Sequence, residues 1–230
     1  MMKVLSFDTS SKALSVALLD GESLMAESLL AIKKNHSTSL MPTIDFLMTS
    51  VGWQAEDLER IVVAKGPGSY TGLRVAVATA KMLAYSLGID LVGVSSLYAL
   101  TGEADKDELV VPIMDARRQN VYVGFYQNGE SLMADRHASF EEVLEVLKGR
   151  ERVHFVGETA LFEDVIKEGL PKAKVSESFP NAALIGLKGQ YLSVEDIDAF
   201  VPNYAKRVEA EENWLKTHTL SGNEHYVKRV

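Results

Sequence analysis

Apolar residues near the start of the chain follow a short, strand-like spacing. Val4 to Asp8 and Leu14 to Asp20 are apolar or alternating runs, and a turn signal at Asp20-Gly21 precedes the run from Ser23 to Ala31. From Ser37 to Val51 the apolar residues recur at helical spacing instead. The pattern therefore predicts three antiparallel strands followed by a helix.

The next segments predict a strand, a helix and another strand. Arg60 to Ala64 is rich in β-branched residues, and a glycine-rich turn then leads into a helix from about Thr71 to Leu87, which Gly88 ends. Leu91 to Val94 follows as a short apolar run that is typical of a buried strand. The first half of the chain therefore has the predicted order β-β-β-α-β-α, then β.

The second half begins in the same way as the first. Leu109 to Asp115 is an apolar run that ends in Asp, Val121 to Tyr126 has the pattern of a strand, and a hairpin turn follows. The six residues from Gly21 to Ala26 recur letter for letter from Gly129 to Ala134, at the same place in the strand pattern. This recurrence indicates that the two halves arose by duplication.

Two β-β-β-α-β-α lobes in tandem predict an α/β fold of the actin-like (ribonuclease H-like) type, with an abbreviated second lobe. Actin, Hsp70 and sugar kinases share this plan, and their nucleotide lies between the lobes. We expect an N-terminal lobe over residues 1–102 and a C-terminal lobe over residues 103–230. The prediction allows the segment from about residue 202 to pack on the first lobe instead of the second.

Charge and composition narrow the function classes. The 230 residues carry a net charge of -8, which argues against a chain that grips a nucleic-acid backbone by itself. The absence of cysteine excludes a disulfide framework, a thiolate nucleophile and a cysteine-ligated zinc site. The first residues reach a charge before any apolar signal region, and no apolar run is long enough to span a membrane. We therefore expect a cytoplasmic protein without a membrane span.

The segment from Gly66 to Gly72 is the first candidate for chemistry. It lies between a predicted strand and a predicted helix, where glycines expose backbone N–H groups that suit an anion. Its spacing matches neither the Rossmann fingerprint nor the Walker A loop. The alternative is a tight turn in which Ser69 or Thr71 caps the helix, and the local pattern favours this turn.

Two further turns resemble the phosphate-binding hairpins of actin-like proteins. Asp8 to Ser11 closes the first strand, and Asp115 to Arg118 closes the matching strand of the second lobe. Ordinary polar strand ends with a solvated arginine are the alternative. The candidate phosphate-loop residues are Asp8, Thr9, Ser10, Gly66, Gly68, Ser69, Gly72, Asp115 and Arg117.

The predicted helix from Gly72 to Leu87 is apolar almost all round, with only Arg74 and Lys81 as charges. Small residues recur along it at every fourth position, at Gly72, Ala76, Ala80 and Ala84. Such a helix is buried on more than one face, either by its own core or by a partner. We expect a partner, and the methionines of the preceding helix suit an adaptable interface.

Other enzymatic signals are weak. The five histidines show no zinc-ligand spacing, and no serine lies in a nucleophile-elbow motif. The carboxylates form no evident pair. The sequence therefore predicts neither a catalytic residue nor a metal site.

Four motifs together resemble the TsaB (YeaZ) family. They are Asp8-Thr9-Ser10, Asn35-His-Ser, the run from Lys65 to Arg74, and Pro202-Asn-Tyr-Ala-Lys-Arg. The resemblance covers nearly the whole chain, and the glycine-rich run is its most specific part.

The resemblance implies a pseudo-enzyme. The catalytic relative TsaD carries a metal-binding His-x-x-x-His, and the corresponding positions here hold Ser96 and Leu100. Its adenosine-binding Gly-Gly turn corresponds to Gly157-Glu158, whose carboxylate repels phosphate. The expected partners are TsaD, TsaE and, when the chain is alone, a second copy. Contact with tRNA is expected only through the complex.

No tightly bound cofactor is expected, although weak or shared nucleotide binding is left open. The expected partner interface is a four-helix contact made by the two helices of the first lobe. Its residues are Met41, Ile44, Met48, Arg74, Val75, Ala76, Thr79, Met82 and Tyr85.

Two rival functions share the fold. One is an ATP-dependent small-molecule kinase, which needs Asp8 or Asp115 as a base and an intact adenosine turn. The other is an M22-type glycopeptidase, which needs a metal or a nucleophile.

A separate question is whether basic residues form a patch that faces tRNA. The candidates are Arg117, Arg118, Lys206, Arg207, Lys228 and Arg229.

Overall fold

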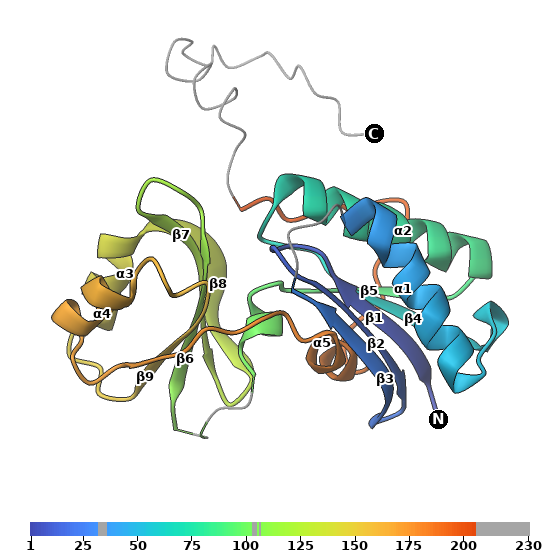
Figure 1. Ribbon diagram of the computed structural model, residues 1–230, viewed down its shortest axis with the longest axis horizontal. Helices are drawn as coiled ribbons and strands as arrows, with labels where there is room; N and C mark the ends of the chain where they lie inside the picture. The colour runs from blue at the N-terminus through green and yellow to red at the C-terminus, as the bar shows by residue number, and fades with distance from the viewer. Residues whose placement is uncertain (32–35, 103–104, 106, 206–230) are drawn as a thin grey trace, which may run out of the picture.

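The protein consists of two lobes, each built on one five-stranded sheet, as a computed structural model shows (Figure 1). The structure describes residues 1–31, 36–102, 105 and 107–205. Both sheets mix parallel and antiparallel strands, and helices pack on them. The predicted α/β class with two related lobes is confirmed.

The first sheet has the strand order β3-β2-β1-β4-β5. Its strands are β1 (Lys3–Asp8), β2 (Leu14–Asp20), β3 (Ser23–Leu30), β4 (Arg60–Ala64) and β5 (Asp90–Val94). The first three strands are antiparallel, and β4 and β5 run parallel to β1. Alternation along β1 sends Leu5 and Phe7 into one core and Val4 into another, so both faces of the sheet are covered.

Helices α1 (His36–Val51) and α2 (Tyr70–Leu87) cover one face of the first sheet. Ser69 caps the start of α2 by accepting a hydrogen bond from Gly72 N–H, and Gly88 ends the helix in the left-handed conformation. The small residues Gly72, Ala76, Ala80 and Ala84 are all buried within the lobe. The expectation that this stripe faces a partner is therefore wrong: small side chains let the helix approach its own sheet.

The second sheet has the order β10-β9-β6-β7-β8. Its strands are β6 (Leu109–Asp115), β7 (Asn120–Gln127), β8 (Glu130–Ser139), β9 (Val153–Gly157) and β10 (Lys174–Val175). Helices α3 (Phe140–Leu147) and α4 (Glu163–Gly169) pack on it around Phe140, Phe155 and Phe162. The described residues also contain two short 3-10 turns, η1 (Ala55–Asp57) and η2 (Tyr98–Leu100).

The chain returns to the first lobe earlier than the sequence suggested. Helix α5 (Ala182–Gly189) packs on the face of the first sheet that α1 and α2 leave open. Ser6 Oγ donates to the carbonyl oxygen of Ala182 over 2.7 Å, and Phe200 is buried in the core under α1 and α2. The predicted boundaries therefore need correction: residues after about 180, and not only those after 202, belong to the first lobe.

The repeated hexapeptide forms equivalent hairpins in the two lobes. The end of α5 contacts both turns: Gln190 Nε2 donates to Gly21 O over 2.8 Å, and Lys188 Nζ donates to Gly129 O over 3.3 Å. The strand pairing shifts register within both hairpins, between Leu18 and Leu19 in the first and on either side of Phe125 in the second. The shared geometry supports duplication of the lobes.

Candidate functional site

The first strand end and the glycine-rich loop meet in the first lobe. Thr9 Oγ1 donates to the carbonyl oxygen of Gly72 over 2.7 Å, and Ser69 N–H donates to the carbonyl oxygen of Ser10 over 2.7 Å. Thr9 and Ser10 are fully or almost fully buried. Thr9 Oγ1 and Ser69 N–H therefore join the two loops, so that these two groups are not directed at an open phosphate site.

The glycines of this loop are required for close backbone contact. A Cβ added at Gly72 would lie 1.9 Å from Thr9 O, and one at Gly68 would lie 2.5 Å from Ser10 O. At Gly66 a Cβ would lie 2.2 Å from Asn203 O, and its φ of +117° is strained for other residues. This packing, together with the Ser69 cap, favours the tight-turn interpretation of the loop.

Asp8 is a buried carboxylate beneath these loops. Its Oδ1 accepts a hydrogen bond of 2.5 Å from Ser10 N–H, while Asp8 Oδ2 and Ser10 Oγ have no hydrogen-bond partner among the described residues. Burial raises the pKa of Asp8 to about 6, against the opposing hydrogen bond from Ser10 N–H and the charge of His36. The carboxyl group therefore changes charge near pH 6 inside the core.

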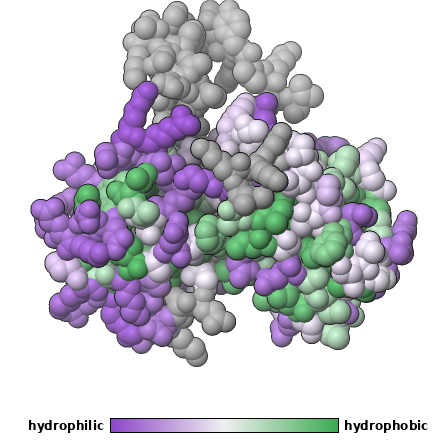
Figure 2. All heavy atoms as spheres, in the orientation of Figure 1, coloured by the Kyte–Doolittle hydropathy of each residue, from purple (hydrophilic) through white to green (hydrophobic). Residues whose placement is uncertain are grey.

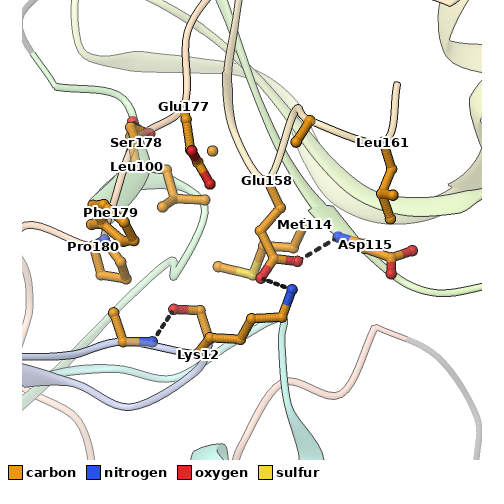
Figure 3. Close-up of a pocket in the computed structure, with 14 residues that line it drawn as sticks. Lys12, Leu100, Met114, Asp115, Glu158, Leu161, Glu177, Ser178, Phe179 and Pro180 are labelled. Atoms are coloured by element: carbon orange, nitrogen blue, oxygen red, sulfur yellow. Dashed lines mark hydrogen bonds and ion pairs between the residues drawn. The ribbon is translucent and has the colours of Figure 1, made fainter. Parts of the chain in front are cut away.

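Asp115, the matching residue of the second lobe, reaches the cleft between the lobes (Figure 3). Its N–H donates to Glu158 Oε2 over 2.9 Å, and Glu158 Oε1 lies 3.6 Å from Lys12 Nζ of the first lobe. Glu158 thus stands where the two lobes face each other, with one contact to each. Arg117, with φ of 68°, is exposed and does not line this cleft.

The cleft is small and rich in carboxylates. Its volume is about 100 Å³, and Asp115, Glu158 and Glu177 line it together with Lys12. Small-molecule sites usually occupy roughly 300–1,000 Å³. Asp8 and the glycine-rich loop do not line it. Of the candidate phosphate-loop residues, only Asp115 lines this cleft.

Ser96 and Leu100, which the resemblance matched with the metal-binding positions of TsaD, are both buried here. Ser96 is buried, and its Oγ accepts a hydrogen bond from Gly66 N–H over 3.1 Å. Leu100 is buried in a small cluster between the lobes. The described residues contain no group of three or more His, Asp or Glu side chains arranged to hold a metal.

The outer face of α1 and α2 carries exposed apolar side chains. Met41, Met82 and Tyr85 are 41%, 53% and 76% exposed, as the sequence led us to expect of interface residues. Phe46, at 67%, belongs to the same group but was not predicted. Its place two residues after the core residue Ile44 was the available signal, because that spacing turns a side chain to the opposite side of a helix.

Three of the predicted interface residues are buried instead. Ile44, Met48 and Ala76 lie in the core under α1 and α2, with exposures of 8% or less. Placing them at a partner interface is therefore wrong, because the inner side of each helix is already occupied by its own sheet. Val75 and Thr79 are half-buried at the border between core and surface.

Arg74 is exposed at the start of α2 and is held by two tyrosines. Its guanidinium carbon lies 4.7 Å from the ring centre of Tyr70, and its Nε donates to Tyr204 Oη over 3.3 Å. The rings of Tyr70 and Tyr204 stack with centres 5.0 Å apart. The C-terminal segment therefore borders the exposed helix face. Of the basic candidates for a tRNA-facing patch, Lys206, Arg207, Lys228 and Arg229 lie outside the described residues.

No helix in the described part of the chain combines the length and the apolar character needed to cross a membrane. On the face shown in the space-filling view, hydrophilic residues dominate the second lobe, and hydrophobic residues are spread more widely over the first (Figure 2).

The chain resembles known proteins in both sequence and structure. The family model described as TsaD, tRNA N6-adenosine threonylcarbamoyltransferase, matches residues 26–214. The tRNA threonylcarbamoyladenosine biosynthesis protein TsaB of Bacillus subtilis is 38% identical over 227 residues, which cover 94% of this chain and 99% of that protein. The Escherichia coli protein of the same name is 30% identical over 133 residues, covering 56% of this chain and 57% of its own.

Solved structures agree with the sequence relatives. YeaZ from Pseudomonas aeruginosa superposes with a TM-score of 0.74 at 26% identity, covering 89% of this chain and all of that one. Component A of (R)-2-hydroxyglutaryl-CoA dehydratase from Acidaminococcus fermentans, with a TM-score of 0.51 at 14% identity, shares the fold alone; the superposition covers 82% of this chain and 98% of that one. The chain therefore belongs to the TsaB (YeaZ) family of tRNA threonylcarbamoyladenosine biosynthesis proteins.

Proposed function

We propose that this chain is a non-catalytic subunit that binds a TsaD-type protein and supports transfer of a threonylcarbamoyl group to an adenosine of tRNA, with TsaE joining the complex. The observation that carries the proposal is the exposed apolar face of two neighbouring helices, formed by Met41 and Phe46 of α1 and Met82 and Tyr85 of α2. We call these four residues the helix-pair face. Contact with tRNA then comes through the complex.

The composition of the helix-pair face suits a partner. Two methionines and two aromatic residues are residue types that protein interfaces favour, and their exposure leaves apolar area in water until a second surface covers it. Because α1 and α2 already bury their inner sides, the contact adds a layer of helices without changing the fold. Arg74 and Tyr70 at the edge of the face supply a polar rim.

The non-catalytic part of the proposal is supported by the cleft. Glu158 places a carboxylate between the lobes, and Ser96 and Leu100, which the resemblance matched with the metal-binding histidines of TsaD, are buried. Any nucleotide in this chain is accordingly weakly bound or shared within the complex.

A reconstituted transfer assay tests the function. TsaD, TsaE, tRNA and the activated donor are combined with this chain and without it, and the chain is also supplied alone. We expect transfer only when the chain and TsaD are present together. Transfer by the chain alone would show that it has its own active site, and full activity without it would show that it is dispensable.

Introducing negative charges on the helix-pair face tests whether this face binds TsaD. Phe46→Glu combined with Tyr85→Glu should weaken co-purification with TsaD at least tenfold, because two charges would be buried without partners. Val146→Glu is the matched control, since Val146 is 44% exposed but lies on α3 of the second lobe. Equal binding by both variants would place the interface elsewhere.

The same face is proposed to join two copies when the chain is alone. Sedimentation of the pure protein should then show a dimer that the Phe46→Glu, Tyr85→Glu variant converts to a monomer. Added TsaD should displace the second copy, because both occupants cover the same residues. A dimer that survives the double substitution would separate self-association from partner binding.

A further inference from the structure

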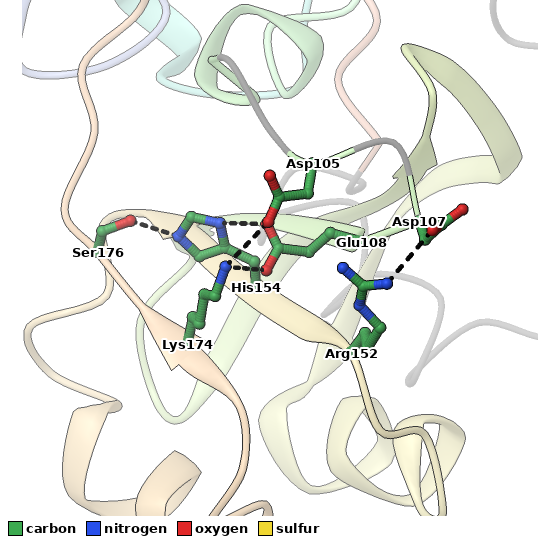
Figure 4. Close-up of polar contacts among 7 residues, drawn as sticks. All are labelled: Asp105, Asp107, Glu108, Arg152, His154, Lys174 and Ser176. Carbon is green, nitrogen blue, oxygen red and sulfur yellow. Dashed lines mark hydrogen bonds and ion pairs between the residues drawn. The ribbon is translucent and has the colours of Figure 1, made fainter.

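A serine, a histidine and a glutamate from three adjoining strands of the second lobe lie in one hydrogen-bonded row (Figure 4). Ser176 Oγ is 2.6 Å from His154 Nε2, and His154 Nδ1 is 3.2 Å from Glu108 Oε2. Glu108 directly precedes β6, His154 lies on β9 and Ser176 directly follows β10. The strand order β10-β9-β6 therefore brings together residues that are far apart in sequence.

The surroundings assign a tautomer to His154. Burial raises the pKa of Glu108, but hydrogen bonds and charges from Lys174 and His154 outweigh burial and hold the pKa below its ordinary value. An ionised carboxylate only accepts hydrogen bonds, so His154 Nδ1 donates to Glu108. In the neutral imidazole His154 Nε2 is then the acceptor for the hydroxyl of Ser176, which is the arrangement that makes a serine nucleophilic.

Solvent exposure of the side chains increases along the row from Glu108 to Ser176, as a reactive serine requires. The side chain of Glu108 is 5% exposed and that of His154 is 18% exposed, while Ser176 is exposed to solvent. The carboxylate is thus shielded, and the hydroxyl is open to small reagents. Lys174, with its ammonium 2.8 Å from Glu108 Oε1 and 3.4 Å from Asp105 Oδ2, is a further charged group beside the row.

We propose that Ser176 is an activated nucleophile that accepts an acyl group from small activated acyl donors such as active esters. In the reaction Ser176 Oγ forms a bond to the carbonyl carbon, and the bond from that carbon to the leaving oxygen breaks. The leaving group departs with the electron pair, and the hydroxyl proton passes to His154 Nε2. Glu108 is a positioning residue that holds the imidazole and stabilises its protonated form.

The product is a stable acyl-serine that does not turn over. Hydrolases stabilise the tetrahedral intermediate with free N–H donors, but Ser176 N–H already donates to Phe155 O and Ser178 N–H to Gly157 O. A single equivalent of acyl group per chain is therefore the expected stoichiometry.

The test uses p-nitrophenyl acetate on the full chain, with the rate of acetylation at each serine followed by peptide mass spectrometry. Ser176 should react at least tenfold faster than Ser131, an exposed serine on β8 whose hydroxyl donates to Met133 O over 2.8 Å. His154→Gln should lower the Ser176 rate about a hundredfold and leave Ser131 unchanged, because only Ser176 loses a general base.

Variants at Glu108 test positioning separately from folding. Circular dichroism and thermal unfolding first establish that each variant is folded. Glu108→Gln should then lower the ratio of the Ser176 rate to the Ser131 rate, and Glu108→Asp should restore part of it. Equal acetylation of Ser176 and Ser131, or a Ser176 rate that is unchanged in His154→Gln, would overturn the proposal.

Discussion

Thr9 and Gly72 are in contact through both backbone and side chain. Thr9 Oγ1 donates to Gly72 O over 2.7 Å, and an added Cβ at Gly72 would lie 1.9 Å from Thr9 O. Gly72→Ala should therefore force the glycine-rich loop away from the first strand end and lower the free energy of unfolding by roughly 3 kcal/mol. Urea denaturation measures this loss. Thr71→Ala, at an exposed neighbouring position, should change stability by less than about 0.5 kcal/mol.

Asp8 should make stability depend on pH. Its pKa is about 6 in the folded protein against an ordinary value of 3.8, so between these values the folded state binds more protons than the unfolded state. The contribution of Asp8 is fully present below about pH 4 and is lost as the pH rises through 6; the loss is on the order of 3 kcal/mol.

Asp8→Asn should remove that dependence. The amide oxygen can still accept from Ser10 N–H, so the variant should be more stable than the natural protein by roughly 1–3 kcal/mol at pH 7.5 and no more stable at pH 4. Urea denaturation at the two pH values measures the difference. A variant that is destabilised at pH 7.5 would show that the ionised carboxylate has a stabilising partner.

Ala76 and Ala78 on helix α2 distinguish the core side from the partner side. Ala76 is fully buried, so Ala76→Glu should lower the free energy of unfolding by roughly 3 kcal/mol or more and leave little folded protein. Ala78 is exposed, so Ala78→Glu should fold with near-normal stability and weaken TsaD binding. Thermal unfolding measures the stability of each variant, and co-purification measures its binding to TsaD. Similar stability of both variants would contradict the placement of the helix.

Glu158 should set the affinity of the cleft for anions. Glu158→Gln keeps an acceptor for Asp115 N–H and removes one negative charge, so ADP should bind about tenfold more tightly in calorimetric titration. Because Lys12 is 73% exposed, loss of the ion pair should cost less than about 1 kcal/mol of stability. Glu163→Gln, an i,i+4 partner of Lys167 outside the cleft, is the control and should leave ADP binding unchanged.

The strands and helices could be predicted closely because their signals are local. The alternation of β1 and β2, the β-branched run of β4 and the Ser69 and Gly88 ends of α2 each act through neighbouring residues, and the structure has elements at these places. The recurrence of Gly21–Ala26 at Gly129–Ala134 likewise indicated equivalent hairpins before any contact was known.

Which face of a helix is covered was beyond the sequence. Helix α2 is apolar almost all round, so periodicity alone could not assign Ala76 to the core and Met82 to the surface. Phe46 was missed although its spacing of two residues from Ile44 turns it to the side of α1 opposite the core.

The sequence by itself determined the strand and helix order of the first lobe, the duplicated lobes and the family motifs, because propensity, turns and repeats are properties of short segments. Only the tertiary structure decided that α5 returns to the first lobe, that Glu158 meets Lys12 across the cleft and that Ser176, His154 and Glu108 form one row. These contacts join residues tens of positions or more apart. Their geometry is set by packing of whole elements, which no local pattern encodes.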